Sequence, residues 1–365
     1  MIKRTEGPTI VYTGGGTAGH IFPGLAVLEE TRKLTGDRCH HCWIASRRGM
    51  DRRLVENAGI SFYAISSGKL RRYVSLRNLA DAFRVAAGLV QAYVLMKKLK
   101  PAVVFSKGGY VTVPVVLAAR LLKIPVISHE SDAEPGLATR MNGRFSSRIL
   151  VSYPETIDCF PSALKPRIEV SGNPVRPEIL SGDPRRGREL SGPGPEPLVL
   201  VLGGSQGARQ INNLIAGCLP ALLRLGRVVH QHGNWDAPPE KTSGYLPRDF
   251  ISEELSDFMA AADLIVCRAG ASTLWEVATL SKPSILIPLG TASSRGDQIA
   301  NARIFQRKGA SLVLEGDPRP EDLEREIAGL LGSPDRLKAM GQAAGNMVQR
   351  NAAVYIARIL YEEVE

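Results

Sequence analysis

Two glycine-rich turns carry the residue types best suited to binding an anion. The first reads GGGTAGH over residues 14–20, and the second reads GGSQGA over residues 203–208. Each follows an apolar run and precedes a helical one, so backbone N–H groups and the positive end of a helix would converge on a bound group. In the second turn, Ser205 and Gln206 can add side-chain hydrogen bonds. The pattern therefore predicts two phosphate-type sites.

The first turn has the G-x-G-x-x-G spacing of a dinucleotide site through Gly14, Gly16 and Gly19. A NAD site also needs an acidic residue about 20 residues further on, where it binds the ribose hydroxyls. The strand expected there ends in Ser-Arg-Arg at 46–48. A NAD enzyme is therefore disfavoured, while the arginines leave an NADP enzyme open as an alternative.

His20 directly follows the last glycine of the first turn. It falls in the first turn of the expected helix, with Pro23 close behind, as helix starts tolerate. The positive end of the helix dipole disfavours a protonated imidazole there. A neutral imidazole can accept a proton from a substrate hydroxyl, which is the work of a general base. The alternative, of equal weight for this residue taken alone, is that His20 caps the helix or packs.

Further polar side chains follow the strands of the second half. Small residues at 269–273 precede a helix whose first turns carry Glu276. This arrangement suits a diphosphate, with the carboxylate accepting both hydroxyls of a ribose. The alternative is a glutamate that only serves the helix dipole. Arg295, Asp297 and Gln298 follow the next strand, where they would face a ligand.

The first half places polar residues after two neighbouring strands. Lys107 and the segment 108–110, Gly-Gly-Tyr, follow one strand, and His129, Glu130 and Asp132 follow the next. They could form a second polar site, or they could be loop residues that satisfy one another. The number of elements that converge favours the site.

The stretch CHHC, residues 39–42, has the C-x-x-C spacing of a zinc or redox motif. A zinc site needs a second ligand pair, and a redox motif would open a helix, whereas these residues lie in an expected strand whose side chains alternate between faces. We therefore expect core packing. The sequence also has no Asp-x-Asp to hold a divalent ion on a nucleotide diphosphate. We expect no metal and no cofactor, with helix N-termini and Arg176 neutralising a leaving diphosphate.

Short apolar strands alternate with helical stretches along the 365 residues, and 44% of the residues are hydrophobic. This alternation predicts parallel sheets covered by helices. The strand–turn–helix pattern recurs after mid-chain, which predicts two doubly wound, Rossmann-like α/β domains facing a central cleft. The segment 181–197 is rich in glycine, proline and charge, and it reads as a linker or a surface excursion.

The net charge of +10 is concentrated in the first half of the chain. Residues 1–172 hold 25 basic and 13 acidic residues, whereas residues 173–365 hold 21 and 23. No apolar run approaches the roughly 18 residues that a spanning helix needs. The N-terminus leads straight into a strand without room for a signal peptide, and an odd count of five cysteines fits a reducing cytoplasm.

Residues 67–100 hold eight basic residues and one acidic residue. Apolar residues recur there at helical spacing: Leu76, Leu79, Phe83, Ala87, Val90 and Val94. One stripe of this helix is expected to pack on the sheet. Basic residues beside apolar ones could also lie on anionic lipid headgroups. The expected contact residues are Arg71, Arg72, Leu76, Leu79 and Phe83. Nucleic acid is disfavoured because no recognition motif accompanies the charge.

With these residues assembled, the chain resembles the MurG family of peptidoglycan glycosyltransferases along nearly its whole length. The matching stretches occur in family order and are GGGTAGHIFPGLA, SSGKLRRYVSL, FSKGGYVTVPVVLAA, HESDAEPGLA, GNPVR, GGSQGA, RAGASTLWE and SRGDQIANA. The resemblance implies a GT-B fold. It also implies transfer of N-acetylglucosamine from UDP-N-acetylglucosamine (UDP-GlcNAc), with inversion, to the muramoyl 4-hydroxyl of lipid I, the undecaprenyl-diphosphate-linked muramoyl peptide, which forms lipid II. The implied location is the cytoplasmic face of the cell membrane, as a peripheral protein.

The resemblance further implies a domain plan and a set of site residues. The domains would be an acceptor and membrane domain at 1–172, a UDP-sugar domain at 173–345 and a C-terminal helix at 346–365 that crosses back. The donor site carried over comprises Thr17, Ala18, Gly19, Asp132, Arg176, Ser205, Gln206, Ile251, Ala271, Ser272, Thr273, Glu276 and Gln298. The acceptor side would be formed by Gly16, Tyr110, His129 and Glu130, with His20 as the catalytic base.

Two positions depart from the family pattern. Asp132 stands where much of the family has asparagine beside the donor sugar, and Asp297 stands where one branch has a second glutamine. An acid near a departing diphosphate would repel it, which puts the assignment of Asp132 in doubt. The alternatives are a GT-B transferase for another lipid acceptor, as in glycolipid synthesis, a UDP-GlcNAc epimerase, and a catalytically silent UDP-sugar sensor.

Overall fold

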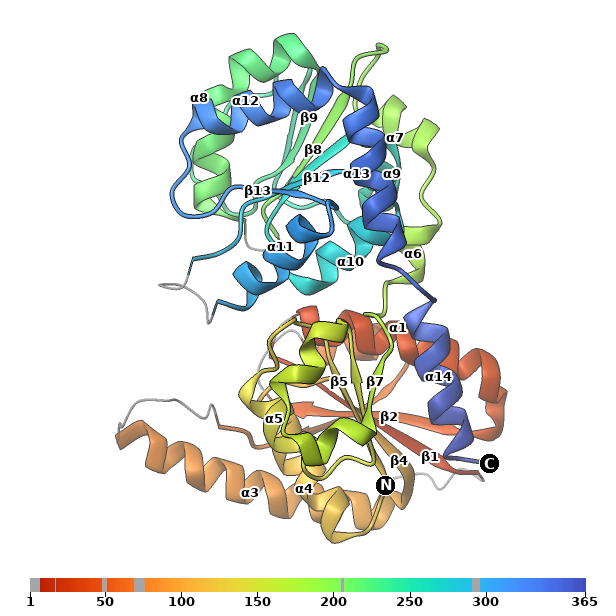
Figure 1. Cartoon of the computed structure of the whole chain (residues 1–365). Helices are drawn as coiled ribbons and strands as arrows, with labels where there is room; N and C mark the ends of the chain where they lie inside the picture. Colours follow the sequence, from red (N-terminus) through yellow and green to blue (C-terminus); the bar gives the residue numbers. More distant parts are fainter. Residues whose placement is uncertain (1–6, 17, 48–50, 69–75, 205–206, 291–295) are drawn as a thin grey trace. The chain divides into compact units, whose positions relative to one another are not determined.

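The computed structural model describes residues 7–16, 18–47, 51–68, 76–204, 207–290 and 296–365. The chain divides into two compact units. The first contains the described residues up to Val175 together with Arg350–Glu365, and the second is Arg176–Gln349. Figure 1 shows that each unit is an α/β layer structure, as the alternation of strands and helices predicts.

The sheet of the first unit is parallel and has the strand order β3-β2-β1-β4-β5-β6-β7. The order reverses between β1 and β4, the place where doubly wound sheets bind ligands. The strands are β1 (Thr9–Thr13), β2 (His40–Ser46), β3 (Ser61–Ile65), β4 (Pro101–Ser106), β5 (Val126–Glu130), β6 (Arg148–Val151) and β7 (Ile168–Val170).

Helices cover both faces of this sheet (Figure 1). One core cluster joins the strands to α1 (Ala18–Thr35), α2 (Asp51–Asn57) and α14 (Ala352–Glu362), and another joins them to α3 (Leu76–Leu99) and α4 (Thr112–Leu121). Short elements complete the unit: η1 (Gly36–Arg38), α5 (Leu137–Gly143), η2 (Pro154–Cys159) and η3 (Ser162–Arg167). The C-terminal helix α14 packs against α1. Arg38 of η1, which follows α1, donates from its guanidinium to the Tyr361 hydroxyl of α14 at 3.1 Å.

The sheet of the second unit is also parallel, in the order β10-β9-β8-β11-β12-β13. Its strands are β8 (Leu198–Leu202), β9 (Arg227–Gln231), β10 (Tyr245–Arg248), β11 (Leu264–Cys267), β12 (Ser284–Leu286) and β13 (Leu312–Val313). Its helices are α6 (Pro177–Leu180), α7 (Pro184–Leu190), α8 (Arg209–Leu225), α9 (Leu255–Ala261), α10 (Ala271–Thr279), α11 (Asp297–Arg307), α12 (Pro320–Leu331) and α13 (Pro334–Asn346).

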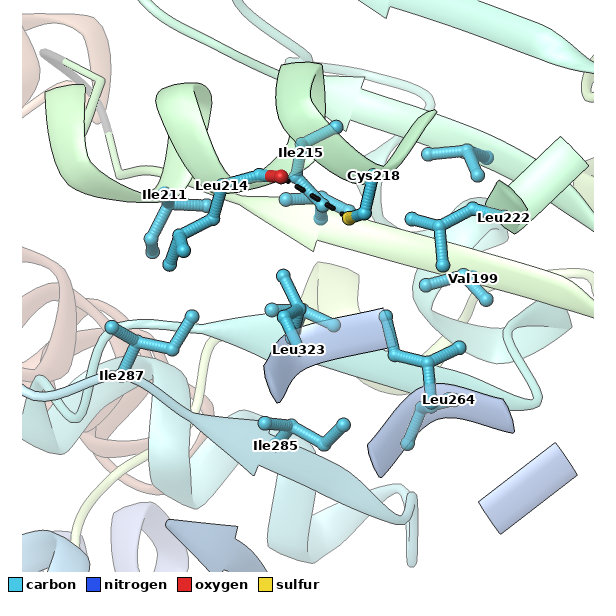
Figure 2. Close-up of a cluster of buried hydrophobic side chains, with 14 of the residues drawn as sticks. Val199, Ile211, Leu214, Ile215, Cys218, Leu222, Leu264, Ile285, Ile287 and Leu323 are labelled. Atoms are coloured by element: carbon cyan, nitrogen blue, oxygen red, sulfur yellow. Dashed lines mark hydrogen bonds between the residues drawn. The ribbon is translucent and has the colours of Figure 1, made fainter. Parts of the chain in front are cut away.

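Figure 2 shows the main core of the second unit, where one face of α8 lies over the sheet. Ile211, Leu214 and Cys218 are spaced at three to four residues, so they share the buried stripe of the helix. The Cys218 thiol donates to the Leu214 carbonyl at 3.1 Å, which satisfies the polar group that this stripe buries at that point. This core holds β8 and β11 in place, and both strands end in the turns of the candidate site.

Two predictions from the sequence are narrowed at this level. The segment 181–197 does not link the two units, because it lies within the second one and contains α7, whose Gly187 packs against Asp257 of α9. The other interpretation, a surface excursion, describes it, since most of its residues are exposed. One stripe of α3, which includes Ala92 and Met96, packs against the strands in the core with α4, as predicted. Phe83 and Val90 lie outside this stripe and are 70% and 63% exposed.

Candidate active site

The first glycine turn connects β1 to α1 at the point where the strand order reverses. Gly16 has φ of +90°, a conformation that favours glycine, and the Gly14 carbonyl accepts a hydrogen bond of 3.0 Å from the indole of Trp43. The first turn of α1 has no acidic residue, so no carboxylate of that turn neutralises the positive end of the helix. The turn is thus held by the core and presents a helix N-terminus suited to an anion.

Another glycine-rich turn, residues 108–110, follows β4 and packs against the first glycine turn. Gly108 and Gly109 both have φ of +87°, and a Cβ atom on Gly109 would lie 2.6 Å from the Gly15 carbonyl oxygen. A Cβ atom on Gly16 would lie 3.1 Å from the ring of Tyr110. The two turns interlock because they lack side chains, which brings Tyr110 beside Gly16; the acceptor role of both residues stays a prediction.

The imidazole of His20 lies against the turn 108–110. His20 is the third residue of α1 and is half-buried. Its Cδ2 atom would be 3.4 Å from a Cβ atom on Gly109, and its Nδ1 atom 3.9 Å from one on Gly108. The structure therefore brings His20 and Tyr110, from α1 and from the loop after β4, to the same interlocked pair of turns. The role of His20 as a general base stays a prediction.

His129 and Glu130 bind their own surroundings. Oε1 of Glu130 accepts hydrogen bonds from the backbone N–H groups of Ser131, at 2.9 Å, and Asp132, at 3.1 Å, and Oε2 accepts one from Gly136 at 3.0 Å. His129 is fully buried, and its Nε2 bonds the Gly172 carbonyl at 2.9 Å. Burial lowers the pKa of His129 well below its ordinary value, so this imidazole is neutral. The sequence left two interpretations open, and the second one, loop residues that satisfy one another, describes these two side chains. Their acceptor role stays a prediction.

The glycine turn of the second unit connects β8 to α8. A Cβ atom on Gly203 would meet the Ala208 nitrogen at 2.8 Å, and one on Gly207 would meet the His232 carbonyl at 2.1 Å. Only glycine fits at these two positions, so the turn passes tightly beside the end of β9.

Gln231 is a residue that the sequence reasoning missed. It ends β9, is 5% exposed, donates through Nε2 to the Gly204 carbonyl at 3.0 Å, and accepts through Oε1 from the Ile251 N–H at 3.0 Å. It therefore ties the second glycine turn to Ile251, which the resemblance places in the donor site. No local signal marked it, because the strand that it ends has the half-polar sequence RVVHQ.

Glu276 and Arg176 are joined in this structure. Nε and Nη2 of Arg176 each lie 2.9 Å from Oε1 of Glu276, and Glu276 is 6% exposed. Burial raises the pKa of Glu276, while the neighbouring Arg176 acts in the opposite direction. Two of the predicted donor residues thus form one partly buried ion pair, a better description than a glutamate that only serves the helix dipole.

The first turn of α10 contains Ala271, Ser272 and Thr273 and has no acidic residue, which suits an anion at this N-terminus. Gln298, in the first turn of α11, accepts a hydrogen bond through Oε1 from the Leu289 N–H at 3.0 Å. These residues lie at the carboxyl ends of β11 and β12 in the second unit, as predicted.

Several predicted residues lie outside the described part of the chain: Thr17, Arg71, Arg72, Ser205, Gln206 and Arg295. Ala18 begins α1, Gly19 follows it, and Leu76 and Leu79 lie on α3, but the side chains of Ala18, Leu76 and Leu79 are not described. Their predicted roles stay predictions.

The prediction of core packing for the CHHC stretch holds for His41 and Cys42, which are buried, whereas Cys39 and His40 are partly exposed. The stretch runs into β2, and its two cysteines face opposite sides of the sheet, Cys39 in the cluster with α1 and Cys42 in the cluster with α4. His41 bonds the hydroxyls of Tyr12 at 3.4 Å and Thr35 at 3.2 Å. Among the described residues, no group of three or more His, Cys, Asp or Glu side chains could hold a metal ion.

Comparison with known proteins covers both units. The model of the glycosyltransferase family 28 N-terminal domain matches residues 10–151, and that of the C-terminal domain matches residues 198–356. A protein of Treponema denticola named UDP-N-acetylglucosamine–N-acetylmuramyl-(pentapeptide) pyrophosphoryl-undecaprenol N-acetylglucosamine transferase is 44% identical in an alignment of 379 positions that covers 96% of each chain. A Clostridium botulinum protein of the same name is 43% identical over 318 residues, 86% of this chain and 87% of that one. The crystal structure of Acinetobacter baumannii MurG is similar with a TM-score of 0.75 at 28% identity, over 97% of this chain and 99% of that one.

Proposed function

The chain belongs to glycosyltransferase family 28 and is a hexosyltransferase of GT-B fold, and from this premise we propose that it forms lipid II. It moves N-acetylglucosamine from UDP-GlcNAc to the 4-hydroxyl of the muramoyl sugar of lipid I. The second unit binds the donor, and the first binds the acceptor. The cleft expected from the sequence is part of this proposal.

The observation that carries the proposal is the placement of His20 on the interlocked turns 14–16 and 108–110 in a chain of this family. In the proposed step, His20 takes the proton of the muramoyl 4-hydroxyl, and the oxygen attacks C1 of the donor sugar. The bond from C1 to the diphosphate oxygen breaks, and UDP leaves with the electron pair. One displacement at C1 inverts its configuration.

Two features of the second unit support the handling of the leaving group. The N-terminus of α10 has no acidic residue in its first turn, and Arg176 lies beside this helix through its pair with Glu276. Backbone N–H groups at a helix start and an arginine can both stabilise charge that develops on a diphosphate. The mechanism assigns Arg176 to the diphosphate and Glu276 to the ribose hydroxyls.

Incubation with labelled UDP-GlcNAc and a short-chain lipid I analogue tests the proposal. We expect a labelled disaccharide lipid and an equal amount of UDP, because the sugar goes to the acceptor rather than to water. Parallel reactions with diacylglycerol and without an acceptor separate the alternatives. Product with diacylglycerol alone would favour glycolipid synthesis, and conversion of UDP-GlcNAc to an epimer without an acceptor would favour the epimerase.

Attachment to the membrane surface belongs to the same proposal. Phe83, Val90 and Val94 share one face of α3 and are 70%, 63% and 47% exposed. Basic residues, including Arg84, Lys97 and Lys98, are exposed along the same helix. An apolar stripe flanked by lysine and arginine is the pattern of a helix that lies on anionic lipid. No helix among the described residues is long and apolar enough to cross a membrane.

Replacing Phe83 by glutamate should weaken binding to vesicles of anionic phospholipid by about tenfold, because an apolar contact is lost and a negative charge faces the headgroups. Co-sedimentation measures the bound fraction. Leu190, 37% exposed on α7 of the second unit, supplies the control, since Leu190→Glu changes the same kind of residue away from α3. Equal binding by Phe83→Glu and the unmodified chain would remove α3 from the contact.

A further inference from the structure

Lys107 is a buried cation at the centre of the first unit. It follows β4, its side chain is 1% exposed, and its backbone N–H donates to the Thr13 carbonyl at 2.8 Å. A Cβ atom on Gly14 would lie 3.0 Å from the Cβ of Lys107. The stem of the lysine therefore lies beside the first glycine turn, at the strand pair where the sheet order reverses.

The ammonium of Lys107 points toward the loop after β5. It donates to the Ser131 hydroxyl, which in turn donates to Oδ1 of Asn173 at 2.7 Å. Both Ser131 and Asn173 are buried. The chain of hydrogen bonds holds the ammonium in one place and ties three segments together: the ends of β4 and β5 and the segment after β7.

The charges around Lys107 are mostly negative. Glu130 and Asp132 both raise the pKa of Lys107, but burial outweighs them and lowers it to about 8. His129 lies close enough for Lys107 to lower the pKa of this imidazole further. The ammonium is therefore coupled by charge to both carboxylates of the loop after β5.

We propose that Lys107 is a positioning residue that allows a diphosphate to bind beside Asp132, by offsetting the carboxylates at this edge of the sheet. The inference rests on the proposed function. Without a cation, Glu130 and Asp132 would repel a diphosphate bound at the first glycine turn. Electrostatic repulsion is strong in a partly dehydrated site, and one buried ammonium weakens it for every anion bound there.

The cost of burying this charge supports the same inference. A buried ammonium is unfavourable unless it is paired, and an apolar side chain of similar length would pack there without that cost. Lys107→Met nevertheless leaves both carboxylates and the Ser131 hydroxyl without their cation, so we expect a lower melting temperature together with weaker diphosphate binding.

Steady-state kinetics of three variants test the inference. We expect Lys107→Met to raise the KM for the lipid I analogue by about tenfold, the size of a coupling between neighbouring charges. In Lys107→Met/Asp132→Asn the unbalanced carboxylate is gone, so most of this loss should be restored. A merely structural role for Lys107 would give no such restoration. If the double variant is no better than Lys107→Met, the inference is wrong.

Lys282 offers a matched control in the second unit. It is a partly buried lysine whose ammonium donates to the carbonyls of Ala260 at 2.6 Å and Ala262 at 3.0 Å. Lys282→Met should change the melting temperature and leave both KM values unchanged.

A rise in the acceptor KM of Lys107→Met assigns the effect to the lipid-linked diphosphate, and a rise in the donor KM assigns it to UDP. A rise in neither contradicts the inference.

The pH dependence supplies a second readout. Below about pH 8 Lys107 is charged and offsets Asp132, and above it the lysine loses its proton, so acceptor affinity should fall as the pH rises through 8. His129 stays neutral in this range. Glu130 and Asp132 act on Lys107 through their charges, and His20 lies against Gly108 and Gly109. The double variant keeps Glu130 and His20, so a limb that does not come from Lys107 would persist in it. We expect the limb to disappear.

Failure of this inference differs from failure of the proposed function. If the unmodified protein makes no disaccharide lipid, the proposed function fails before any variant is compared. If it makes the product and the double variant shows no restoration and keeps the alkaline limb, only the role of Lys107 is overturned.

Discussion

His20→Ala should lower kcat by about 10²- to 10⁴-fold, the contribution that a positioned general base makes to proton transfer. The donor KM should be mostly kept, because most of the donor residues implied by the resemblance, Arg176 and Glu276 among them, lie in the second unit. The imidazole lies on Gly108 and Gly109, and a methyl group in its place cannot accept a proton. The disaccharide assay under saturating substrates measures the loss.

His41→Ala is the matched control for this experiment. His41 is 7% exposed and bonds Tyr12 and Thr35 at the start of β2, at the opposite end of the strands from the glycine turns. Its loss should lower the melting temperature and leave kcat unchanged. If His20→Ala raises the donor KM and keeps kcat, His20 binds the donor, and the base must be sought elsewhere.

Glu276→Gln should raise the KM for UDP-GlcNAc by about 10- to 150-fold, since hydrogen bonds to a charged group contribute about 1.5–3 kcal/mol. The substitution keeps the size of the side chain and removes the charge that holds Arg176 at 2.9 Å. Because Arg176 would then lose its ion pair, its position toward the diphosphate should change as well. Titration with UDP by calorimetry measures the effect without turnover.

The pH dependence of donor binding gives the same prediction a second test. Burial raises the pKa of Glu276, and an acid with a raised pKa loses its charge earlier as the pH falls. UDP affinity should therefore weaken on acidification at a pH above the ordinary range of a glutamate, and Glu276→Gln should lack this limb. Asp257→Asn is the control, because Asp257 is also a buried helix carboxylate, accepting from the Asp183 N–H at 2.8 Å. If Asp257→Asn weakens UDP binding as much as Glu276→Gln, Glu276 has no specific role.

The first strands and turns could be predicted because their signals are local. The run TIVYT became β1 and LVLVL became β8, both fully buried, and a glycine turn and a helix follow each. An uninterrupted apolar run between turn residues is what a parallel strand covered on both faces requires. The doubly wound order followed from repeating that pattern.

Strand β9 was missed because its sequence, RVVHQ, is half polar. Every residue of it is buried all the same, since its polar side chains find partners that lie far apart in the chain. His230 bonds the hydroxyl of Tyr245 at 3.1 Å and Oδ1 of Asn212 at 3.2 Å, and Gln231 joins the second glycine turn to Ile251. Hydropathy cannot reveal burial of this kind, so the support of the donor site was missed with the strand.

The sequence by itself determined the fold class, the two glycine turns and the histidine beside the first of them, because each depends on residues adjacent in the chain. The tertiary structure decided which partners the remaining polar residues bind and which apolar residues stay exposed. The Glu130 carboxylate bonds the backbone of its own loop, Glu276 pairs with Arg176, and Lys107 is buried beside the first glycine turn. One apolar stripe of α3, by contrast, is exposed. These choices depend on which carbonyls, carboxylates and apolar faces meet across the sheet, and the local pattern of residues does not contain that information.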